Sequence, residues 1–219
     1  MSPSGKDVLV TGGTGYVGRP LIAALLARGH RVRALCRGSS ASRVPAGATA
    51  VIGDALDAAS IATALRPGDT VVQLVGTPHP APSKAAEFVR VDLASVKASV
   101  AAAGRTGVAH FVYISVAHPA PVMHAYIAVR AEGELAITDA GLTATILRPW
   151  YVVGPGHRWP IALVPIYAIA SLVPAWRSGA NRLGLVTLKQ MVTTLTRAVE
   201  NPPEEGFRRI LEVPAIRDA

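Results

Sequence analysis

The stretch Val8-Leu9-Val10-Thr11-Gly12-Gly13-Thr14-Gly15-Tyr16-Val17-Gly18 decides the fold of this 219-residue chain. An apolar run ends in a glycine-rich turn, and a second apolar run with helical spacing follows from Leu21. The order is that of a strand, a tight loop and a helix N-terminus. Such a loop lets the backbone approach a pyrophosphate, and the helix start offers it free N–H groups and a positive dipole end.

The position of this loop, after a strand pattern and before a helix pattern, is the context that a dinucleotide-binding loop requires. The alternative is a glycine-rich turn without a ligand, but a tight turn alone needs fewer glycines than the four present here. The predicted cofactor contacts in the loop are Thr11, Gly12, Gly13, Thr14, Gly15, Tyr16, Val17 and Gly18.

The rest of the chain alternates short apolar runs with longer helical ones. Strands are predicted at 8–11, 31–36, 49–52, 70–75, 111–115, 143–147 and 209–213, and helices at 17–28, 60–65, 84–103, 125–139 and 188–200. This alternation predicts an α/β fold, a doubly wound parallel sheet of Rossmann type with a small C-terminal lobe. We expect one NAD(P)-binding domain over 1–219, in which 150–219 contributes a small substrate-side lobe and 150–157 is a loop rich in Gly and Pro.

Composition narrows the class of protein. Half of the residues are hydrophobic, and the formal net charge is +8. The arginines are spread along the chain without a dense run or interleaved aromatic residues, so we expect no nucleic-acid partner. The positive charge suits anionic ligands in general, and an arginine-rich codon bias is the alternative explanation. The single Cys36 excludes an internal disulfide and Met1 leads into a strand without a signal peptide, so we expect a cytoplasmic protein.

The longest apolar region runs from Ile161 to Trp176 and is too short and too rich in proline to span a bilayer comfortably. It predicts a buried helix, or a surface that contacts a membrane or an apolar substrate. Together with Trp150, Tyr151 and Trp159 it is predicted to form the wall or lid of a substrate cleft, because ligands of such sheets lie beyond the strands' carboxyl ends. The sequence leaves the oligomeric state open.

Cofactor choice depends on the end of the second strand. The segment Cys36-Arg37-Gly38-Ser39-Ser40 carries no acid that could hold the ribose hydroxyls of NAD. Arg37 can instead pair with a 2′-phosphate, which favours NADP(H). A solvated loop arginine is the alternative.

Two later strand ends add predicted contacts. Asp54, followed by Ala55, can accept a hydrogen bond from the adenine or can cap the next helix, and both options stay open. Val75, Gly76 and Thr77 end the fourth strand, where a glycine lets a cofactor pass close to the backbone.

A second group of residues suggests chemistry. Tyr126 and Arg130 are four residues apart, so they share one helix face, and a cation one turn away would favour the phenolate. The pair can equally be a surface contact. The histidines lack metal-ligand spacing, so no metal site is predicted.

Four segments occur together in one order: the glycine loop, Tyr113-Ile114-Ser115, Tyr126-x-x-x-Arg130-x-x-Gly133-Glu134, and Leu147-Arg148-Pro149 with Gly154-Pro155-Gly156. Over about residues 7–157 the chain thus resembles the short-chain dehydrogenase/reductase superfamily, in particular its atypical and extended NAD(P)H-binding members, NmrA-like proteins and relatives of a complex I accessory subunit. The resemblance implies that Gly12, Gly15 and Gly18 bind the cofactor and that Tyr126 is the catalytic tyrosine.

Two departures from that family pattern keep two functions open. Arg130 stands where the family has a lysine that orients the nicotinamide ribose and lowers the tyrosine pKa, a role in which the two cations are not interchangeable. Ser115 lies close to the place of the family's catalytic hydroxyl, but another register puts Val116 there. The first hypothesis is an NADP-dependent oxidoreductase that exchanges hydride with a small, apolar carbonyl or quinone-like substrate, with catalytic Tyr126, Arg130 and Ser115. The second is a non-catalytic NADP(H)-binding sensor or assembly module.

Overall fold

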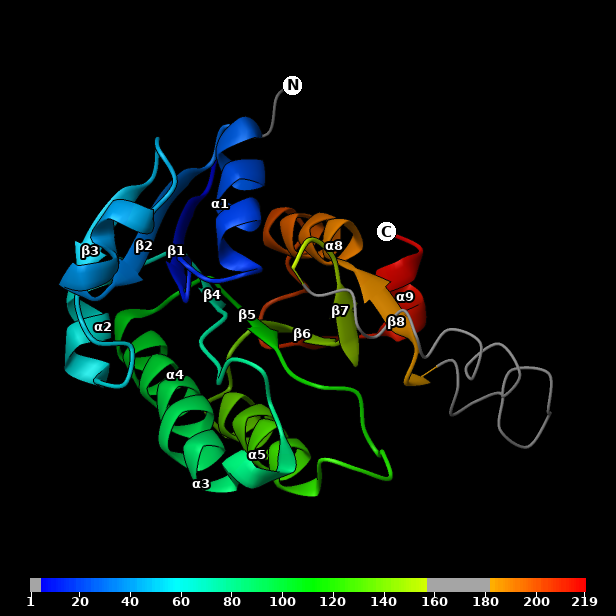
Figure 1. Ribbon diagram of the computed structural model, residues 1–219. Helices are drawn as coiled ribbons and strands as arrows, with labels where there is room; N and C mark the ends of the chain where they lie inside the picture. Colours follow the sequence, from blue (N-terminus) through cyan, green and yellow to red (C-terminus); the bar gives the residue numbers. More distant parts are fainter. Residues whose placement is uncertain (1–4, 157–181) are drawn as a thin grey trace.

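The computed structural model describes residues 5–156 and 182–219, and Figure 1 shows their arrangement. A central sheet has seven parallel strands in the order β3-β2-β1-β4-β5-β6-β9. The chain adds strands outward on one side of β1 as far as β3 and then on the other side from β4, and ligands of such sheets bind at this switch point between β1 and β4. The strands are β1 (Asp7–Thr11), β2 (Arg31–Cys36), β3 (Thr49–Ile52), β4 (Thr70–Gln73), β5 (His110–Ile114), β6 (Ala144–Arg148) and β9 (Arg208–Glu212).

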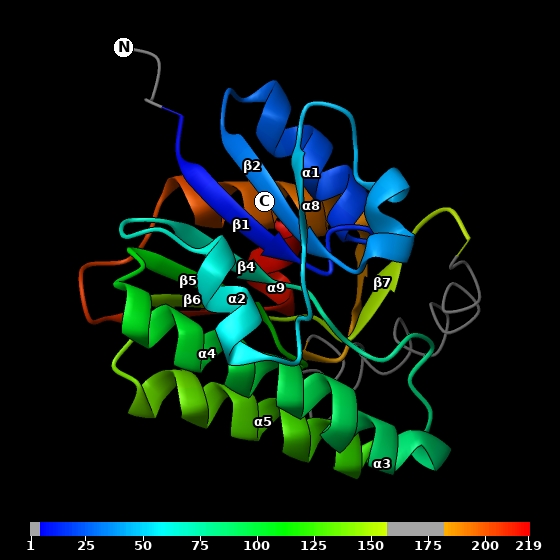
Figure 2. The same ribbon diagram turned by 90° about the vertical axis from the view of Figure 1, so that its left-hand side faces the viewer.

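Helices cover both faces of this sheet (Figure 2). One face carries α1 (Gly18–Ala27) and α8 (Leu188–Glu200), with α9 (Val213–Arg217) packed beside α8, and the other carries α2 (Ala58–Ala64), α4 (Ala94–Thr106) and α5 (His124–Asp139). Neighbouring β1 side chains serve different faces, because Val8 and Val10 join one core cluster and Leu9 the other. The predicted doubly wound α/β fold is confirmed.

The predicted helix over 84–103 is divided into four pieces. A 3₁₀ turn η2 (Pro82–Lys84) leads into the short α3 (Ala85–Glu87), a π-helical segment η3 (Phe88–Leu93) and then α4. A π-helical turn is rare and is frequent at functional sites. Here the segment carries Asp92, which is buried in the interior.

The predicted loop at 150–157 also differs from the structure. Tyr151–Val153 forms β7, which pairs in parallel with β8 (Leu185–Thr187) as a second, two-stranded sheet. The residues Tyr151-Val152-Val153 have a high strand propensity. The sequence nevertheless predicted a loop, because Gly and Pro are frequent nearby and the partner strand β8 lies more than thirty residues further along the chain. The segment 161–176 and Trp159 lie outside the described residues.

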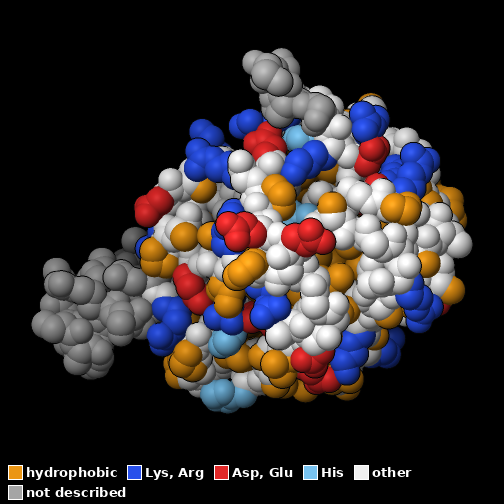
Figure 3. Space-filling model, turned by 180° about the vertical axis from the view of Figure 1, so that it is seen from behind, with side chains coloured by type: hydrophobic (Ala, Val, Ile, Leu, Met, Phe, Trp, Pro, Cys, Tyr) orange, Lys and Arg blue, Asp and Glu red, His pale blue; other side chains and the backbone are white. Residues whose placement is uncertain are grey.

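The net positive charge is not gathered on the face seen in Figure 3, where blue Lys and Arg side chains lie among red acidic and orange hydrophobic ones. This distribution agrees with the absence of a basic run in the sequence. Among residues 5–156 and 182–219, no helix has the length and apolar character needed to cross a membrane.

Candidate functional site

A pocket of about 520 Å³ opens at the carboxyl ends of β1 to β4. Its volume lies in the range of small-molecule and cofactor pockets. The pocket brings together eight of the residues predicted to bind a cofactor, namely Gly12, Thr14, Gly15, Arg37, Asp54, Ala55, Val75 and Gly76. The remaining ones, Thr11, Gly13, Tyr16, Val17, Gly18, Thr77 and Arg130, are not part of its lining.

The glycines of the loop serve different purposes. Gly12 has φ +72°, and a Cβ there would meet the backbone carbon of Leu74 at 2.8 Å. A Cβ on Gly18 would lie 2.4 Å from the Gly12 oxygen, so α1 packs against the loop only with a glycine there. Gly15 is exposed, and its Cβ would meet only the Gly12 oxygen, at 3.2 Å. The loop therefore leaves the backbone at Gly15 open to the pocket, which is the fit that a pyrophosphate needs.

Thr11 does not face the pocket. It is fully buried, and its hydroxyl donates to the side-chain oxygen of Gln73 at the end of β4. That oxygen also accepts from the backbone N–H of Val75 at 3.1 Å, and the Gln73 amide nitrogen donates to Ser95 on α4 at 2.8 Å. Through these hydrogen bonds, Thr11 and Gln73 connect the start of the glycine loop to the segment after β4 within the protein interior.

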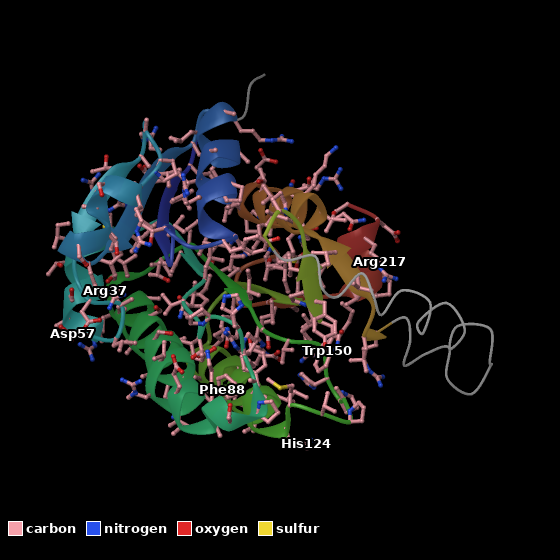
Figure 4. All side chains as sticks on the ribbon, in the orientation of Figure 1. Arg37, Asp57, Phe88, His124, Trp150 and Arg217 are labelled. Carbon is pink, nitrogen blue, oxygen red and sulfur yellow. The ribbon has the colours of Figure 1, made fainter. Side chains whose placement is uncertain are left out.

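Three arginines reach the pocket from two sides. Arg37 directly precedes the 3₁₀ turn η1 (Gly38–Arg43) after β2, Arg43 is the last residue of that turn, and Arg90 comes from the π-helical segment. Among the described residues no carboxylate lies within 4 Å of these three guanidinium groups, although Asp54 and Glu87 also line the pocket. Figure 4 shows Arg37 on the β2–β3 side, opposite the helices that carry Phe88. The pocket can therefore balance several negative charges of a ligand.

The second option for Asp54, a helix cap, is not what the structure shows. Its Oδ1 accepts from the backbone N–H of Leu56 at 2.9 Å within a turn. The carboxylate that caps α2 is Asp57, labelled in Figure 4, which accepts from the N–H groups of Ala59 and Ser60. Asp54 keeps its place at the pocket.

Arg130 is 5% exposed and forms an ion pair with the buried Asp92, with 2.5 Å between Nη2 and Oδ1. Its Nη1 donates to the carbonyl of Ile114 at 2.9 Å. Burial acts to lower the pKa of Arg130, but the neighbouring Tyr126, Tyr113 and Asp92 together raise it, so the guanidinium stays charged. The other Asp92 oxygen accepts from the N–H and hydroxyl of Thr77.

Tyr126 stands near the start of α5 and is half-buried. Its ring lies edge-on to Phe88 with centroids 4.9 Å apart, and the Arg130 guanidinium carbon is 5.0 Å from its centroid. Tyr126 and Arg130 therefore share one helix face and are in contact, as the four-residue spacing predicted.

Ser115 has a different environment. It is 2% exposed and donates its hydroxyl proton to Glu134 on α5 at 2.5 Å. The same carboxylate accepts two hydrogen bonds from Arg148, whose third nitrogen donates to Glu212 of β9. The Glu134 hydrogen bond sets the pKa of Arg148 above its usual value, so this cation is permanent.

The residues that the sequence analysis missed are buried polar ones and one pocket arginine: Gln73, Asp92, Glu134 as a partner of Ser115, and Arg90. A signal existed for Asp92, since an acid within an otherwise apolar helical pattern is uncommon unless it is paired. Gly133, part of the quoted motif, leaves room for the Tyr113 hydroxyl, which a Cβ would meet at 2.8 Å.

The smaller sheet also touches the glycine loop. A Cβ on Gly154, directly after β7, would lie 2.5 Å from the Tyr16 hydroxyl oxygen. Figure 4 shows Trp150 on the β7 side of the site, and its ring packs edge-on against Tyr151 at 5.6 Å. Aromatic side chains thus stand at the side of the loop away from Arg37.

Comparison with known proteins agrees with this geometry. Residues 12–157 match a family profile described as NAD(P)H-binding. A 3-diazoavenalumate denitrifying reductase of Streptomyces sp is 29% identical over 221 residues, which covers 89% of this chain and 72% of that protein. The divinyl chlorophyllide a 8-vinyl-reductase of Oryza sativa subsp. indica is 34% identical over 164 residues, but this match covers only 40% of the rice protein. Ceramide reductase of Caulobacter vibrioides is 25% identical, and 61% of its length is covered.

Solved structures share the fold. The Bordetella bronchiseptica enzyme WbmH in complex with NAD+ superposes with a TM-score of 0.68 at 23% identity, covering 90% of this chain and 73% of that one. Epimerase Mth375 of Methanothermobacter thermautotrophicus gives a TM-score of 0.68 at 21% identity, covering 99% and 76%. At these identities the likeness extends to the fold alone.

Proposed function

The chain belongs to the NAD(P)H-binding family of the atypical short-chain dehydrogenase/reductase superfamily, and from this premise we propose that it is an NADPH-dependent reductase of an apolar carbonyl or quinone-like compound. The bound dinucleotide would supply hydride. The protein would hold it by the backbone around Gly12 and Gly15, with the adenosine half toward Arg37.

One observation carries the preference for NADPH: the pocket end beside β2 is cationic. Arg37 and Arg43 line it, and neither has a carboxylate within 4 Å among the described residues. Arginine binds phosphate with a planar fork of donors, whereas an NAD-specific site holds the free ribose hydroxyls with a carboxylate. The pocket acid nearest to Arg37 in the sequence is Asp54. It follows β3, whereas the carboxylate of an NAD-specific site follows β2.

Tyr126 is proposed as the acid/base group. Its half-buried ring lies against the guanidinium of Arg130, 5.0 Å from the guanidinium carbon to the ring centroid. Tyr126 would give a proton to the oxygen of the substrate as the carbonyl is reduced. Ser115 would act as an orienting hydroxyl and not as a proton donor, since its hydroxyl already donates a hydrogen bond to Glu134.

The substrate class rests on the relatives and on the sequence. Several relatives are named as reductases, among them the 8-vinyl-reductase, the ceramide reductase and a 4-hydroxy-2-methyl-3-oxo-4-farnesyl-3,4-dihydroquinoline-1-oxide ketoreductase from Stigmatella aurantiaca. The apolar segment 161–176, predicted from the sequence as a wall of the substrate cleft, lies outside the described residues. A cytoplasmic location is part of the same proposal.

The test is a calorimetric titration of the protein with NADPH and NADH, followed by NADPH oxidation with a panel of apolar ketones and quinones. We expect tighter binding of NADPH and turnover with at least one apolar acceptor. Equal affinities would contradict the cofactor preference, and binding without turnover on the panel would favour the second candidate.

That second candidate is a non-catalytic NADP(H)-binding module. It is favoured by the fact that two of the three polar groups proposed for catalysis are already occupied: Ser115 by Glu134 and Arg130 by Asp92. A module of this kind would bind NADPH as tightly but would lose nothing measurable when Tyr126 is changed.

A further inference from the structure

We propose that Asp92 is a positioning residue, which clasps Arg130 and the segment after β4 together and so fixes the backbone over which the dinucleotide passes. The part of this inference that concerns NADPH rests on the proposed function. Asp92 itself does not line the pocket.

The two oxygens of Asp92 hold two different elements. Oδ1 binds the Arg130 guanidinium from α5 at 2.5 Å, and Oδ2 accepts from Thr77 at 2.9 Å from the backbone N–H and 2.6 Å from the hydroxyl. The carboxylate is 1% exposed, so these partners replace all of its contact with water. A buried carboxylate needs such partners, and all three donors here come from outside its own helix.

The clasp explains Gly76, the pocket residue beside Thr77. A Cβ at this position would lie 2.4 Å from Arg130 Nη2 and 3.2 Å from Asp92 Oδ1. The ion pair therefore occupies the space of a side chain, and the Gly76 backbone rests on it. The other side of Gly76 faces the pocket.

The same contacts explain why an arginine suits position 130. Its guanidinium binds Asp92 through Nη2 and the Ile114 carbonyl through Nη1, while Tyr126 and Tyr113 lie 5.0 and 5.8 Å from its carbon. A lysine ammonium has neither the planar fork nor the two faces for these contacts. Asp92 balances the positive charge of Arg130. The arginine therefore connects α5 to the π-helical segment and to the end of β5, in addition to contacting Tyr126.

Further hydrogen bonds connect the clasp to the glycine loop. The Asp92 carbonyl accepts from the Ser95 hydroxyl at 3.0 Å, Ser95 accepts from Gln73, and Gln73 binds Thr11 at the start of the loop. A continuous buried polar chain thus runs beneath the pocket from β1 to α5. Such networks hold a single arrangement only while every member is satisfied.

The decisive variant is Asp92→Asn, matched by Asp69→Asn. An amide of the same shape has one acceptor oxygen and adds a donor, so it cannot serve both Arg130 and Thr77. Asp69 is also 1% exposed and pairs with an arginine, Arg33, at 2.5 and 2.6 Å, but it precedes β4 at the end of the strand away from the pocket. Both variants lose a buried ion pair, and only one of them should disturb the pocket.

Hydrogen–deuterium exchange on the protein without added ligand tests the clasp directly. In Asp92→Asn the peptide covering 74–79 should exchange faster than in the wild type, because the Thr77 amide loses its acceptor. Asp69→Asn should leave this peptide unchanged. Unchanged exchange at 74–79 in Asp92→Asn, or an equal change in both variants, overturns the inference.

Titration with NADPH and with 2′,5′-ADP tests the consequence for the pocket. Asp92→Asn should weaken NADPH binding about tenfold, the loss expected for a charge-assisted contact, and should leave 2′,5′-ADP, which ends before the second half of the dinucleotide, within about twofold. Equal losses for both ligands would show a general disturbance and refute the positioning role.

Thr77→Val is a second variant that can be tested even if Asp92→Asn does not fold. It keeps the ion pair and removes only the hydroxyl contact, so it should weaken NADPH binding by less than about tenfold. A wild type that binds neither ligand would refute the proposed function, and the exchange experiment would still decide the clasp.

Discussion

Arg37 is the residue on which the proposed cofactor preference depends, because it directly follows β2 at the cationic side of the pocket. Arg37→Asp should weaken NADP(H) binding by roughly ten- to a hundredfold, the value of a charge-assisted hydrogen bond of about 1.5–3 kcal/mol. NAD(H), which has no 2′-phosphate, should lose much less. Calorimetry with both cofactors measures the ratio, and Arg105→Asp on the exposed end of α4 is the charge-matched control. Equal losses for the two cofactors would count against the assignment.

Gly15 and Gly18 separate binding from stability within one loop. Gly15→Val should abolish dinucleotide binding with little change in far-UV circular dichroism, because its Cβ would meet only the Gly12 oxygen and would point into the approach to the phosphates. Gly18→Val should instead lower the melting temperature, since its Cβ would lie 2.4 Å from backbone of the loop. If the Gly15 variant keeps its affinity for NADPH, this loop is not the pyrophosphate site.

Tyr126 is the residue that distinguishes an enzyme from a binding module. Tyr126→Phe should lower turnover by about 10²–10⁴, the usual contribution of general acid–base catalysis. NADPH affinity should hardly change, because the ring that packs on Phe88 and Arg130 remains. Steady-state kinetics and calorimetry on the same preparation give the two numbers, and unchanged turnover would exclude Tyr126 as the acid/base.

Among the elements, β5 and β6 share a buried histidine that makes stability depend on pH. His110 is 1% exposed and binds the Thr145 hydroxyl at 2.9 Å. Burial, with smaller effects from Lys6 and Arg209, lowers its pKa from 6.5 to about 4. Between pH 4 and 6.5, His110 is therefore mostly protonated in the unfolded chain and mostly neutral in the folded protein. The free energy of unfolding should fall as the pH falls from about 6.5 toward 4.

The expected loss is about 3 kcal/mol over this window, at 1.36 kcal/mol per pKa unit. His110→Gln removes the titration and should flatten the pH dependence of the free energy of unfolding between pH 4 and 6.5. Urea unfolding at several pH values measures it, with the exposed His124→Gln as control. Parallel pH profiles for wild type and His110→Gln would contradict this role.

The elements also show what the sequence could predict. The strands β2 and β3 and the helix α8 have the predicted bounds, because their patterns are local and complete. The pairing of β7 with β8 could not be predicted, since it joins segments that are distant in the chain. For the site, the glycine loop and Arg37 could be placed at one pocket, as strand ends meet at one edge of a parallel sheet. The partners of buried polar groups, such as Asp92 for Arg130 and Glu134 for Ser115, depend on three-dimensional packing and carry no periodic signal.

At the scale of the whole molecule, one network of ion pairs and hydrogen bonds joins α5 and the ends of β5 and β6 to the last strand of the central sheet, β9. Glu134 of α5 binds Ser115 after β5 and Arg148 of β6, and Arg148 binds Glu212 of β9. Glu134→Ala should cost about 3–5 kcal/mol, because it leaves buried donors without their acceptor. Urea unfolding should show a lower midpoint with the same slope.

The matched control lies on the same helix. Glu132 forms a pair with Lys97 in which both side chains are about half exposed, at 52% and 49%. Glu132→Ala should therefore change stability by at most about 1 kcal/mol. Similar costs for the two variants would mean that the network contributes no more than a surface pair.

The π-helical segment η3 has a consequence for how this protein can change by insertion and deletion. A π-helical turn contains about one residue more than an α-helical turn, so an unbroken α-helix whose flanking turns keep their phase can absorb the loss of a single codon within 88–93. The change would then fall on the segment itself, which carries the buried Asp92 and the pocket residue Arg90. A one-codon deletion here should therefore leave the sheet and α4 in place and alter only the lining of the pocket.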